Sequence, residues 1–188
     1  MLDSIISIDN EMFYYINEYV KKSFITDKIM IFLAEYAQFI FPLLLTVLWL
    51  INKRKSRVVT LQTTLAFGCS FILIKIIKVF SYRDRPFVSH LDINQLVEHS
   101  INSSFPSNHA TSAFVIATTI FLFYKRLGIV YLSLSFGIAF SRIWVGVHYP
   151  LDVIAGIIFG VSISVLFHFI FVKFSKHLNS INIFQEKI

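Results

Sequence analysis

Five long apolar stretches, separated by short polar connections, constrain the fold of this chain more than any other feature. They cover approximately residues 29–51, 58–80, 106–124, 127–140 and 151–172. About 20 apolar residues are enough for a helix to cross the hydrocarbon core of a bilayer. Hydrophobic residues make up 56% of the chain, well above the usual share in a soluble domain. The sequence therefore predicts an all-α, polytopic membrane helical bundle with about five transmembrane helices.

The N-terminal segment, residues 2–20, differs from these stretches because apolar residues alternate there with acidic ones. Leu2, Ile5, Ile6, Met12 and Phe13 are interspersed with Asp3, Asp9, Glu11 and Glu18. This spacing is typical of an amphipathic helix that lies on the membrane surface. We expect residues 1–188 to form a single membrane-embedded domain that includes this interfacial helix.

The first apolar stretch contains two residues that are unusual inside a membrane. Pro42 lies within it and is expected to kink the helix. Glu35 is an acid at a depth where a charge must face protein or water. Two roles for Glu35 follow: an ion pair with Lys75 of the second stretch, or a place in a functional site.

The positions of the basic residues predict the orientation of the chain in the membrane. Lysines and arginines gather in residues 53–57, at residues 125–126 and in the C-terminal tail. With five spans, these segments fall on one side, which the positive-inside rule makes cytoplasmic. The connections 81–106 and 141–151 then lie on the outer face, and the C-terminus is cytoplasmic. Orientation explains the net charge of +6 better than nucleic-acid binding does.

The connection between the fourth and fifth stretches, residues 141–152, carries a distinctive polar pattern. Pro150 suits the first turn of a helix, so a helix is expected to begin near Tyr149. His148 then precedes the helix and Asp152 lies in its first turn. A carboxylate bonded to one ring nitrogen fixes the tautomer and leaves the other nitrogen free to attack. The alternative is an interfacial histidine satisfied by a neighbouring acid.

The predicted topology collects the unusual polar residues at the outer boundary of the membrane. They are Lys78, Arg85, His109, Arg142, His148 and Asp152. Three cations beside two histidines predict a phosphate site, although Lys78 by itself could also extend to the membrane surface. The free N–H groups of a helix that opens at residues 106–109, together with the Ser107 hydroxyl, would add anion donors.

Three motifs in this region resemble the signatures of a known family. Lys78 is followed after six residues by Arg85-Pro86, and residues 106–109 read Pro-Ser-Asn-His. Ser141-Arg142 is followed by His148 and then Asp152 at the third signature's spacing. The set, over residues 78–152, resembles the type-2 phosphatidate phosphatase superfamily, which is related to vanadium haloperoxidases. Asn108 departs from the glycine that many members carry.

A closer resemblance is to the bacterial undecaprenyl-diphosphatases linked to bacitracin resistance. It rests on the small size, the short N-terminal amphipathic segment, Ala34-Glu35-Tyr36 and the Tyr-Arg-Asp-Arg-Pro-Phe sequence of residues 82–87. This resemblance favours an accessory role for Glu35 and makes Arg83 a second candidate, the alternative for Arg83 being a solvated pair with Asp84.

The family resemblance implies a phosphohydrolase that acts through a phosphohistidine, without a metal or other cofactor. His148 would attack the terminal phosphorus, Asp152 would orient it, and His109 would protonate the leaving oxygen and then activate water. The remaining predicted residues would bind the phosphate oxygens: Lys78, Arg85, Ser107, Asn108 and Arg142.

The expected substrate is undecaprenyl diphosphate, a polyprenyl diphosphate lipid, hydrolysed to the monophosphate and inorganic phosphate in carrier-lipid recycling for the cell wall. The expected location is the bacterial plasma membrane, with the site on the extracytoplasmic face. Phosphatidate or phosphatidylglycerophosphate is the alternative substrate. A non-hydrolytic lipid-phosphate transporter is the alternative of another class. The sequence leaves the oligomeric state open.

Overall fold

The computed structural model describes residues 2–51 and 53–180, which are mostly helical and contain no β-strand. In chain order the elements are α1 (Leu2–Asn17), α2 (Phe24–Glu35), η1 (Ala37–Phe39), α3 (Ile40–Leu50), α4 (Arg54–Phe80), α5 (Pro86–Ser89), α6 (Asn108–Phe123), α7 (Lys125–Trp144) and α8 (Pro150–Ser180). The predicted all-α class is confirmed.

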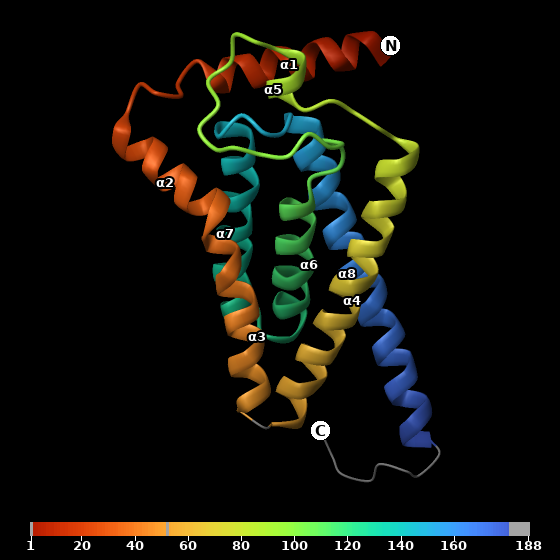
Figure 1. Cartoon of the computed structure of the whole chain (residues 1–188). Coiled ribbons are helices and arrows are strands. Elements are labelled where there is room, and N and C mark those ends of the chain that lie inside the picture. The colour runs from red at the N-terminus through yellow and green to blue at the C-terminus, as the bar shows by residue number, and fades with distance from the viewer. Residues whose placement is uncertain (1, 52, 181–188) are drawn as a thin grey trace.

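Helix α6 lies at the centre of the bundle and packs against α4, α7 and α8 (Figure 1). Most of its side chains are buried, including Ala110, Phe114 and Ala117. Small residues let the neighbouring backbones approach closely, which matters in a membrane because lipid provides little hydrophobic drive for helix association. The central helix thus fixes the positions of the three helices around it.

The length and composition of the helices identify the membrane spans. Helices α4, α7 and α8 are each long and apolar enough to cross a membrane, and α2 together with α3 meets the same test as one bent span. The fifth expected span, α6, has only 16 residues and is shorter than a typical crossing. Within the described residues, the prediction of about five spans therefore corresponds to three candidate crossings, or four if the bent pair is one span, around a shorter central helix.

The first span bends by 42° between α2 and α3. The bend lies at Tyr36, between α2 and η1, and Pro42 lies further along, in the first turn of α3. A proline cannot donate to the carbonyl four residues earlier, which here belongs to Gln38, and its ring clashes with that carbonyl. The first span is bent, but the bend lies at Tyr36 rather than at Pro42, and the helix begins at Phe24 rather than near residue 29.

Helix α1 lies across one end of the bundle, and the long connection between α4 and α6 covers the same end (Figure 1). Its residues 3–8 are exposed, whereas Asp9 and Phe13 are buried. Phe13 packs edge-on against Tyr149, so the amphipathic N-terminal helix is anchored at the start of α8.

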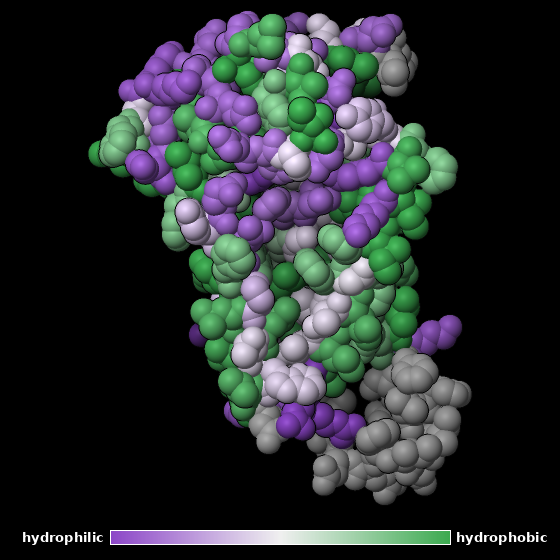
Figure 2. Space-filling model, viewed as in Figure 1, coloured by the Kyte–Doolittle hydropathy of each residue, from purple (hydrophilic) through white to green (hydrophobic). Residues whose placement is uncertain are grey.

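The surface divides into a polar end and an apolar shaft. Hydrophilic residues cover the end that carries α1, and hydrophobic residues cover the body of the bundle below it (Figure 2). The basic α3–α4 connection and the α6–α7 turn lie at the opposite end, as does the last described turn of α8 (Figure 1). The predicted grouping of basic segments at one end is therefore present in the fold; residues 181–188 of the basic tail lie outside the described part of the chain.

Two boundaries differ from the sequence-based prediction. Helix α7 continues to Trp144, so Ser141 and Arg142 belong to its last turn rather than to a connection. Helix α4 begins at Arg54, and its first turn includes basic residues that were assigned to the loop. Charged side chains are compatible with helix ends because they extend into the interface. Helix α8 starts at Pro150, as predicted.

Candidate active site

The connection between α7 and α8 folds tightly and buries His148. The N–H groups of Val147 and His148 both donate to the carbonyl of Arg142, each at 3.2 Å. Gly146 makes this turn possible because its φ is +83°, and a Cβ there would lie 3.0 Å from the carbonyl oxygen of Asn94. The imidazole is 1% exposed and therefore sits inside the protein at the polar end of the bundle.

Asp152 reaches back from the first turn of α8 toward His148, as predicted, but Ser104 lies between them. The carboxylate Oδ2 is 3.5 Å from Nδ1 of His148, longer than an ordinary hydrogen bond. The Ser104 hydroxyl donates to the same Oδ2 in a short hydrogen bond, and its oxygen lies 3.2 Å from Nδ1. The N–H of Tyr149 also donates to Oδ2, at 2.9 Å. The imidazole and the carboxylate are thus linked through a hydroxyl.

Arg85 occupies the other side of the imidazole. Its Nη1 lies 3.2 Å from Nε2 of His148 and donates to the carbonyl of Val147 at 2.8 Å. Its Nε and Nη2 both donate to Oδ1 of Asn102, at 3.1 and 2.8 Å. A guanidinium has no acceptor, so Nε2 presents its lone pair and the neutral ring carries its proton on Nδ1.

Burial and charge control protonation in this part of the site. Burial lowers the pKa of His148 from 6.5 to about 3; the nearby Asp152 carboxylate opposes this effect and the Arg85 cation adds to it. Burial also lowers the pKa of Arg85 to about 10, and the Arg142 cation contributes in the same direction. His148 is therefore neutral and Arg85 is charged at neutral pH.

Arg142 extends from the last turn of α7 and is fully buried. Its Nη1 donates to the carbonyl of Ala34 at 2.9 Å and pairs with Oε1 of Glu35 at 3.3 Å. Its Nε and Nη2 are buried without a hydrogen-bond partner among the residues described here. Two unused donors on a buried guanidinium are suited to an anionic ligand.

The contact with Arg142 decides between the two roles expected for Glu35. In the described chain Glu35 pairs with Arg142, not with Lys75, so the alternative of a Glu35–Lys75 ion pair is wrong. Lys75 instead places its ammonium 4.5 Å from the ring centroid of Phe71. The bend that follows Glu35 turns α2 toward α7, which brings this acid to the predicted site residue.

Lys78 and the start of α6 complete the cluster. Lys78 donates to the carbonyl of Ser103 at 2.8 Å and lies within electrostatic range of Arg85 and Asp152. Ser107 caps α6 by accepting from the N–H of Ala110, and its own N–H donates to the carbonyl of Asp152 at 3.0 Å. The Ser107 backbone donor is therefore already used, while its hydroxyl proton remains available.

His109 lies in the first turn of α6, within electrostatic range of His148, Arg85 and Arg142. Asn108 beside it is exposed, and the first-turn N–H groups of both residues have no acceptor within the helix. The fold thus brings together all of the residues predicted for catalysis and phosphate binding. They are Lys78, Arg85, Ser107, Asn108, His109, Arg142, His148 and Asp152.

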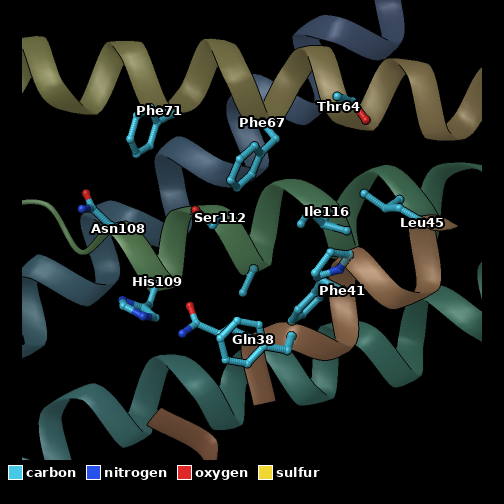
Figure 3. A pocket seen from close by; sticks show the side chains of 13 residues that line it. Gln38, Phe41, Leu45, Thr64, Phe67, Phe71, Asn108, His109, Ser112 and Ile116 are labelled. Atoms are coloured by element: carbon cyan, nitrogen blue, oxygen red, sulfur yellow. The ribbon is translucent and has the colours of Figure 1, made fainter. Parts of the chain in front are cut away.

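A pocket of about 430 Å³ leads away from His109 toward the opposite end of the bundle. Asn108 and His109 lie at one end of it, and Leu45 and Ile116 lie at the other (Figure 3). Aromatic and aliphatic side chains of α3, α4 and α6 form most of its wall, and the Gln38 side chain extends toward the histidine end (Figure 3). The polar cluster thus continues into an apolar groove.

Arg83 connects Asp152 to helix α1. Its Nη1 donates to Oδ1 of Asp152 at 2.9 Å, and its Nη2 donates to Oδ2 of Asp9 at 2.6 Å. Of the two roles considered for Arg83, the structure therefore shows contact with a site residue. The guanidinium also stacks on Tyr149, with its carbon 3.9 Å from the ring centroid.

Sequence reasoning did not identify Asp9, Asn102 or Ser104 as site residues. Asn102 and Ser104 were treated as part of a polar loop, although they immediately precede the Phe-Pro-Ser-Asn-His segment that contributes to the site. Asp9 was assigned to the polar face of α1. Its position next to the buried face of that helix was the available signal.

Within residues 2–51 and 53–180, no group of three or more histidine, cysteine or acidic side chains is arranged to hold a metal ion. Cys69 is free and exposed on α4. The charged groups at the site are instead dominated by lysine and arginine, which bind phosphate oxygens directly.

The bundle and its site define a membrane lipid phosphatase. The chain belongs to the PAP2 superfamily, which it matches over residues 59–176. It is 41% identical over 159 residues to the bacitracin transport permease protein BcrC of Bacillus licheniformis, covering 85% of this chain and 78% of that protein. It is 30% identical over 168 residues to the undecaprenyl-diphosphatase BcrC of Bacillus subtilis strain 168, covering 89% and 84%.

A solved structure has the same fold. The crystal structure of the first transmembrane PAP2-type phosphatidylglycerolphosphate phosphatase from Bacillus subtilis matches with a TM-score of 0.73. The match covers 90% of this chain and 87% of that one at 24% identity, so it concerns the fold alone. The predicted family and the predicted membrane helical bundle are both confirmed.

Proposed function

We propose that this protein hydrolyses undecaprenyl diphosphate to undecaprenyl phosphate and inorganic phosphate. One observation carries the proposal: an apolar groove begins at His109, which lies within electrostatic range of Arg85 and Arg142, and runs along α6. A diphosphate at the cluster would leave its hydrocarbon tail in this groove and in the surrounding lipid. The Bacillus subtilis relative named undecaprenyl-diphosphatase BcrC supports a prenyl tail rather than an acyl tail.

The first chemical step is attack of His148 on the terminal phosphorus. The Nε2 lone pair forms the N–P bond while the bond from phosphorus to the bridging oxygen breaks. His109 protonates this leaving oxygen, so the product is the lipid monophosphate. Arg85 holds Nε2 at 3.2 Å before the reaction and shifts to a phosphate oxygen when the substrate binds.

The second step releases phosphate from the histidine. His109, now neutral, accepts a proton from water as the water oxygen attacks the phosphorus. The N–P bond breaks and its electron pair returns to Nε2, which regenerates the neutral imidazole. Asp152 acts through Ser104 in both steps, because their hydrogen bonds stabilise the positive charge that develops on the ring.

The cations stabilise the charge on the transferring group. Arg142 offers its two unpartnered donors, and Lys78 and Arg85 approach from other elements. Phosphoryl transfer depends mainly on positioning and charge stabilisation, which are tasks that three fixed cations can perform. We accordingly propose that the reaction needs no metal ion, with Ser107 and the N–H groups at Asn108 and His109 completing the phosphate cradle.

The site is proposed to face the outside of a bacterial cell, with the C-terminus in the cytoplasm. The support is the basic character of the end of the bundle that carries the α3–α4 and α6–α7 connections. The test is labelling of intact cells with a membrane-impermeant thiol reagent after Ser100→Cys or Lys53→Cys, each combined with Cys69→Ala. Labelling of the Ser100→Cys variant alone is expected, and labelling of the Lys53→Cys variant alone would reverse the orientation.

Phosphate release by the purified protein in detergent, with a chelator present, tests the activity. The substrates are undecaprenyl diphosphate, a short prenyl diphosphate, phosphatidate and phosphatidylglycerophosphate, each measured beside His148→Ala. We expect preference for the prenyl diphosphates, no release by the variant and no effect of the chelator. Preference for a glycerolipid would replace the substrate and keep the chemistry.

Two other outcomes would change the mechanism. Release by His148→Ala at the wild-type rate would exclude this residue as the nucleophile. Release from none of the lipids would favour the alternative of a lipid-phosphate transporter, which needs the cations for capture but has no use for a nucleophile.

A further inference from the structure

Asp9 is a buried carboxylate on a helix that is otherwise largely exposed. It is 2% exposed, although it belongs to α1, which lies across the polar end of the bundle (Figure 1). Removing a charged carboxylate from water costs several kcal/mol unless hydrogen bonds and an opposite charge compensate. The partners of Asp9 therefore indicate why an acid is retained at this position.

The first partner is the N-terminus of α8. Oδ1 of Asp9 accepts from the N–H of Leu151 at 2.8 Å. This N–H belongs to the first turn of α8, where backbone donors have no acceptor within the helix. A negative charge at a helix N-terminus is also favoured by the helix dipole. Asp9 thus caps, from another element, the helix turn that carries Asp152.

The second partner is Arg83, which links the two carboxylates. Its guanidinium donates from Nη2 to Asp9 at 2.6 Å and from Nη1 to Asp152 at 2.9 Å. Both carboxylates have fully buried side chains, whereas the Arg83 side chain is 24% exposed. Without Asp9 only the bond to Asp152 and the contact with Tyr149 would hold the guanidinium, and its exposed edge would allow it to turn toward solvent.

The position of Asp152 depends on this linkage because Arg83 binds the oxygen that Ser104 does not. Oδ1 accepts from Arg83, while Oδ2 accepts from Ser104, which contacts His148. Rotation of the carboxylate would therefore disturb both sides at once. Asp9 also affects the charge of Asp152. Because Arg83 pairs with both carboxylates, it neutralises less of the negative charge of Asp152 than it would if it paired with Asp152 alone.

We propose that Asp9 is a positioning residue for the phosphatase reaction, acting through Arg83 and the Leu151 N–H to hold Asp152 in register with His148. The proposal rests on the proposed function, because it assigns Asp9 to the same reaction. In this proposal helix α1 supports the reaction through Asp9, in addition to contacting the membrane surface. Docking of α1 would then be a condition for full activity.

The first test is Asp9→Asn, which keeps the shape and the Oδ1 acceptor but removes the charge that Arg83 needs. We expect kcat for undecaprenyl diphosphate to fall on the order of 10- to 100-fold, as for a small misplacement of a catalytic group, with KM within about twofold. The melting temperature in detergent should stay close to that of the wild type. A loss confined to stability or to KM would show that Asp9 only docks α1.

The matched control is Glu11→Gln, which removes a charge of the same sign from the exposed face of the same helix. Glu11 contacts Ser7 within α1 and nothing in the site, so kcat should not change. An equal loss of kcat in both variants would indicate a general effect of charge at the membrane surface and would overturn the proposal.

A double-mutant cycle identifies the route of the effect. If Asp9 acts through Arg83, then Asp9→Asn combined with Arg83→Gln should have nearly the kcat of Arg83→Gln alone. Fully additive losses would mean that Asp9 acts by another route. If Asp9→Asn does not fold, the kcat of Arg83→Gln tests the proposal by itself. A folded Arg83→Gln protein with the wild-type kcat would overturn it.

The outcomes also separate this inference from the proposed function. A wild type that prefers another lipid phosphate would change the proposed substrate, and the cycle would then be measured with that lipid. A wild type that hydrolyses undecaprenyl diphosphate beside an equally active Asp9→Asn variant would overturn the inference alone. A wild type that hydrolyses no lipid phosphate would overturn both.

Discussion

The oxygen of Ser104 lies 3.2 Å from Nδ1 of His148, closer than the carboxylate of Asp152 at 3.5 Å. The hydroxyl donates to that carboxylate and accepts from the ring N–H, so it transmits the carboxylate's charge to the imidazole. A serine between the acid and the histidine also fixes the ring from a segment distant in sequence. The histidine is therefore held by three separate parts of the chain.

This arrangement predicts that Ser104→Ala slows catalysis. The substitution removes the bridge and leaves the His148–Asp152 pair at 3.5 Å, beyond good hydrogen-bond distance. Since hydrogen bonds to charged groups contribute about 1.5–3 kcal/mol, kcat should fall on the order of 10- to 100-fold while KM changes little. Steady-state phosphate release over a range of substrate concentrations measures both constants.

Ser164→Ala is the control for the loss of a buried hydroxyl. Ser164 is fully buried in α8 and contacts Thr119 at 2.8 Å, away from the cationic cluster. We expect its effect on the melting temperature to be comparable and its kcat to be unchanged. A kcat for Ser104→Ala equal to that of the wild type would mean that Asp152 acts on His148 without the serine.

The geometry of Arg142 predicts that lysine cannot replace it. One nitrogen is held by Ala34 and Glu35, and two further nitrogens are free to bind an anion. A lysine ammonium is a single point charge and cannot provide these separate donors. Arg142→Lys should therefore lower kcat/KM on the order of 10- to 100-fold, consistent with the loss of one charge-assisted hydrogen bond.

The corresponding control is Arg126→Lys, because Arg126 is exposed at the opposite end of the bundle. Its kcat/KM should equal that of the wild type. Arg142→Lys with undiminished kcat/KM would show that the buried guanidinium supports the fold by its charge alone and that its free donors do not reach the substrate.

The lowered pKa of His148 predicts how stability depends on pH. Burial holds this pKa at about 3 in the folded protein, whereas it is near 6.5 in the unfolded chain. Between these values the unfolded state binds more protons, so the free energy of unfolding falls as the pH falls through that range. From pH 7 to pH 5 the contribution of this group amounts to about 2 kcal/mol.

Thermal unfolding in detergent at pH 7 and pH 5 measures this effect, with His148→Asn as the comparison. The wild type should lose more stability on acidification than the variant, because the variant lacks the titrating ring. Equal losses in the two proteins would mean that the folded and unfolded states protonate His148 over the same pH range, so that its burial does not contribute to the pH dependence.

Much of the site could be predicted from the sequence because the spacing of residues within a motif determines how far apart their side chains lie. Pro150 marks the start of α8, and the spacing from His148 to Asp152 places the carboxylate in the first turn beside the histidine. The apolar stretches predicted the helices in the same way. These features depend on residues close in sequence, where helix geometry determines the distances.

The contacts of Asp9, Ser104 and Glu35 could not be predicted because they depend on how distant segments pack. Asp9 contacts Arg83 and Leu151, 74 and 142 positions away in the sequence. Glu35 reaches Arg142 only because the first span bends after it. Nothing local to Glu35 in the sequence selects Arg142 over Lys75, the other partner considered for it.

Gly156 and Gly160 of α8 lie against α6 and allow the two helices to approach closely. A Cβ at Gly156 would lie 2.8 Å from the carbonyl oxygen of Ser107 and 3.0 Å from Cβ of Ala110. Alanine there would force α8 away from α6 and weaken the Ser107–Asp152 backbone hydrogen bond of 3.0 Å. Gly156→Ala should thus cost about 1–3 kcal/mol of stability and also reduce kcat.

Gly68→Ala separates this packing effect from a general effect of glycine in a membrane helix. Gly68 lies in α4, and a Cβ there would meet nothing within 4 Å. Alanine at this position improves helix propensity without a clash, so stability should be unchanged or slightly higher and kcat should match the wild type. Thermal unfolding and phosphate release, measured for both variants, test the comparison. If Gly156→Ala behaved like Gly68→Ala, the close approach of α8 to α6 would not be what holds Asp152 in place.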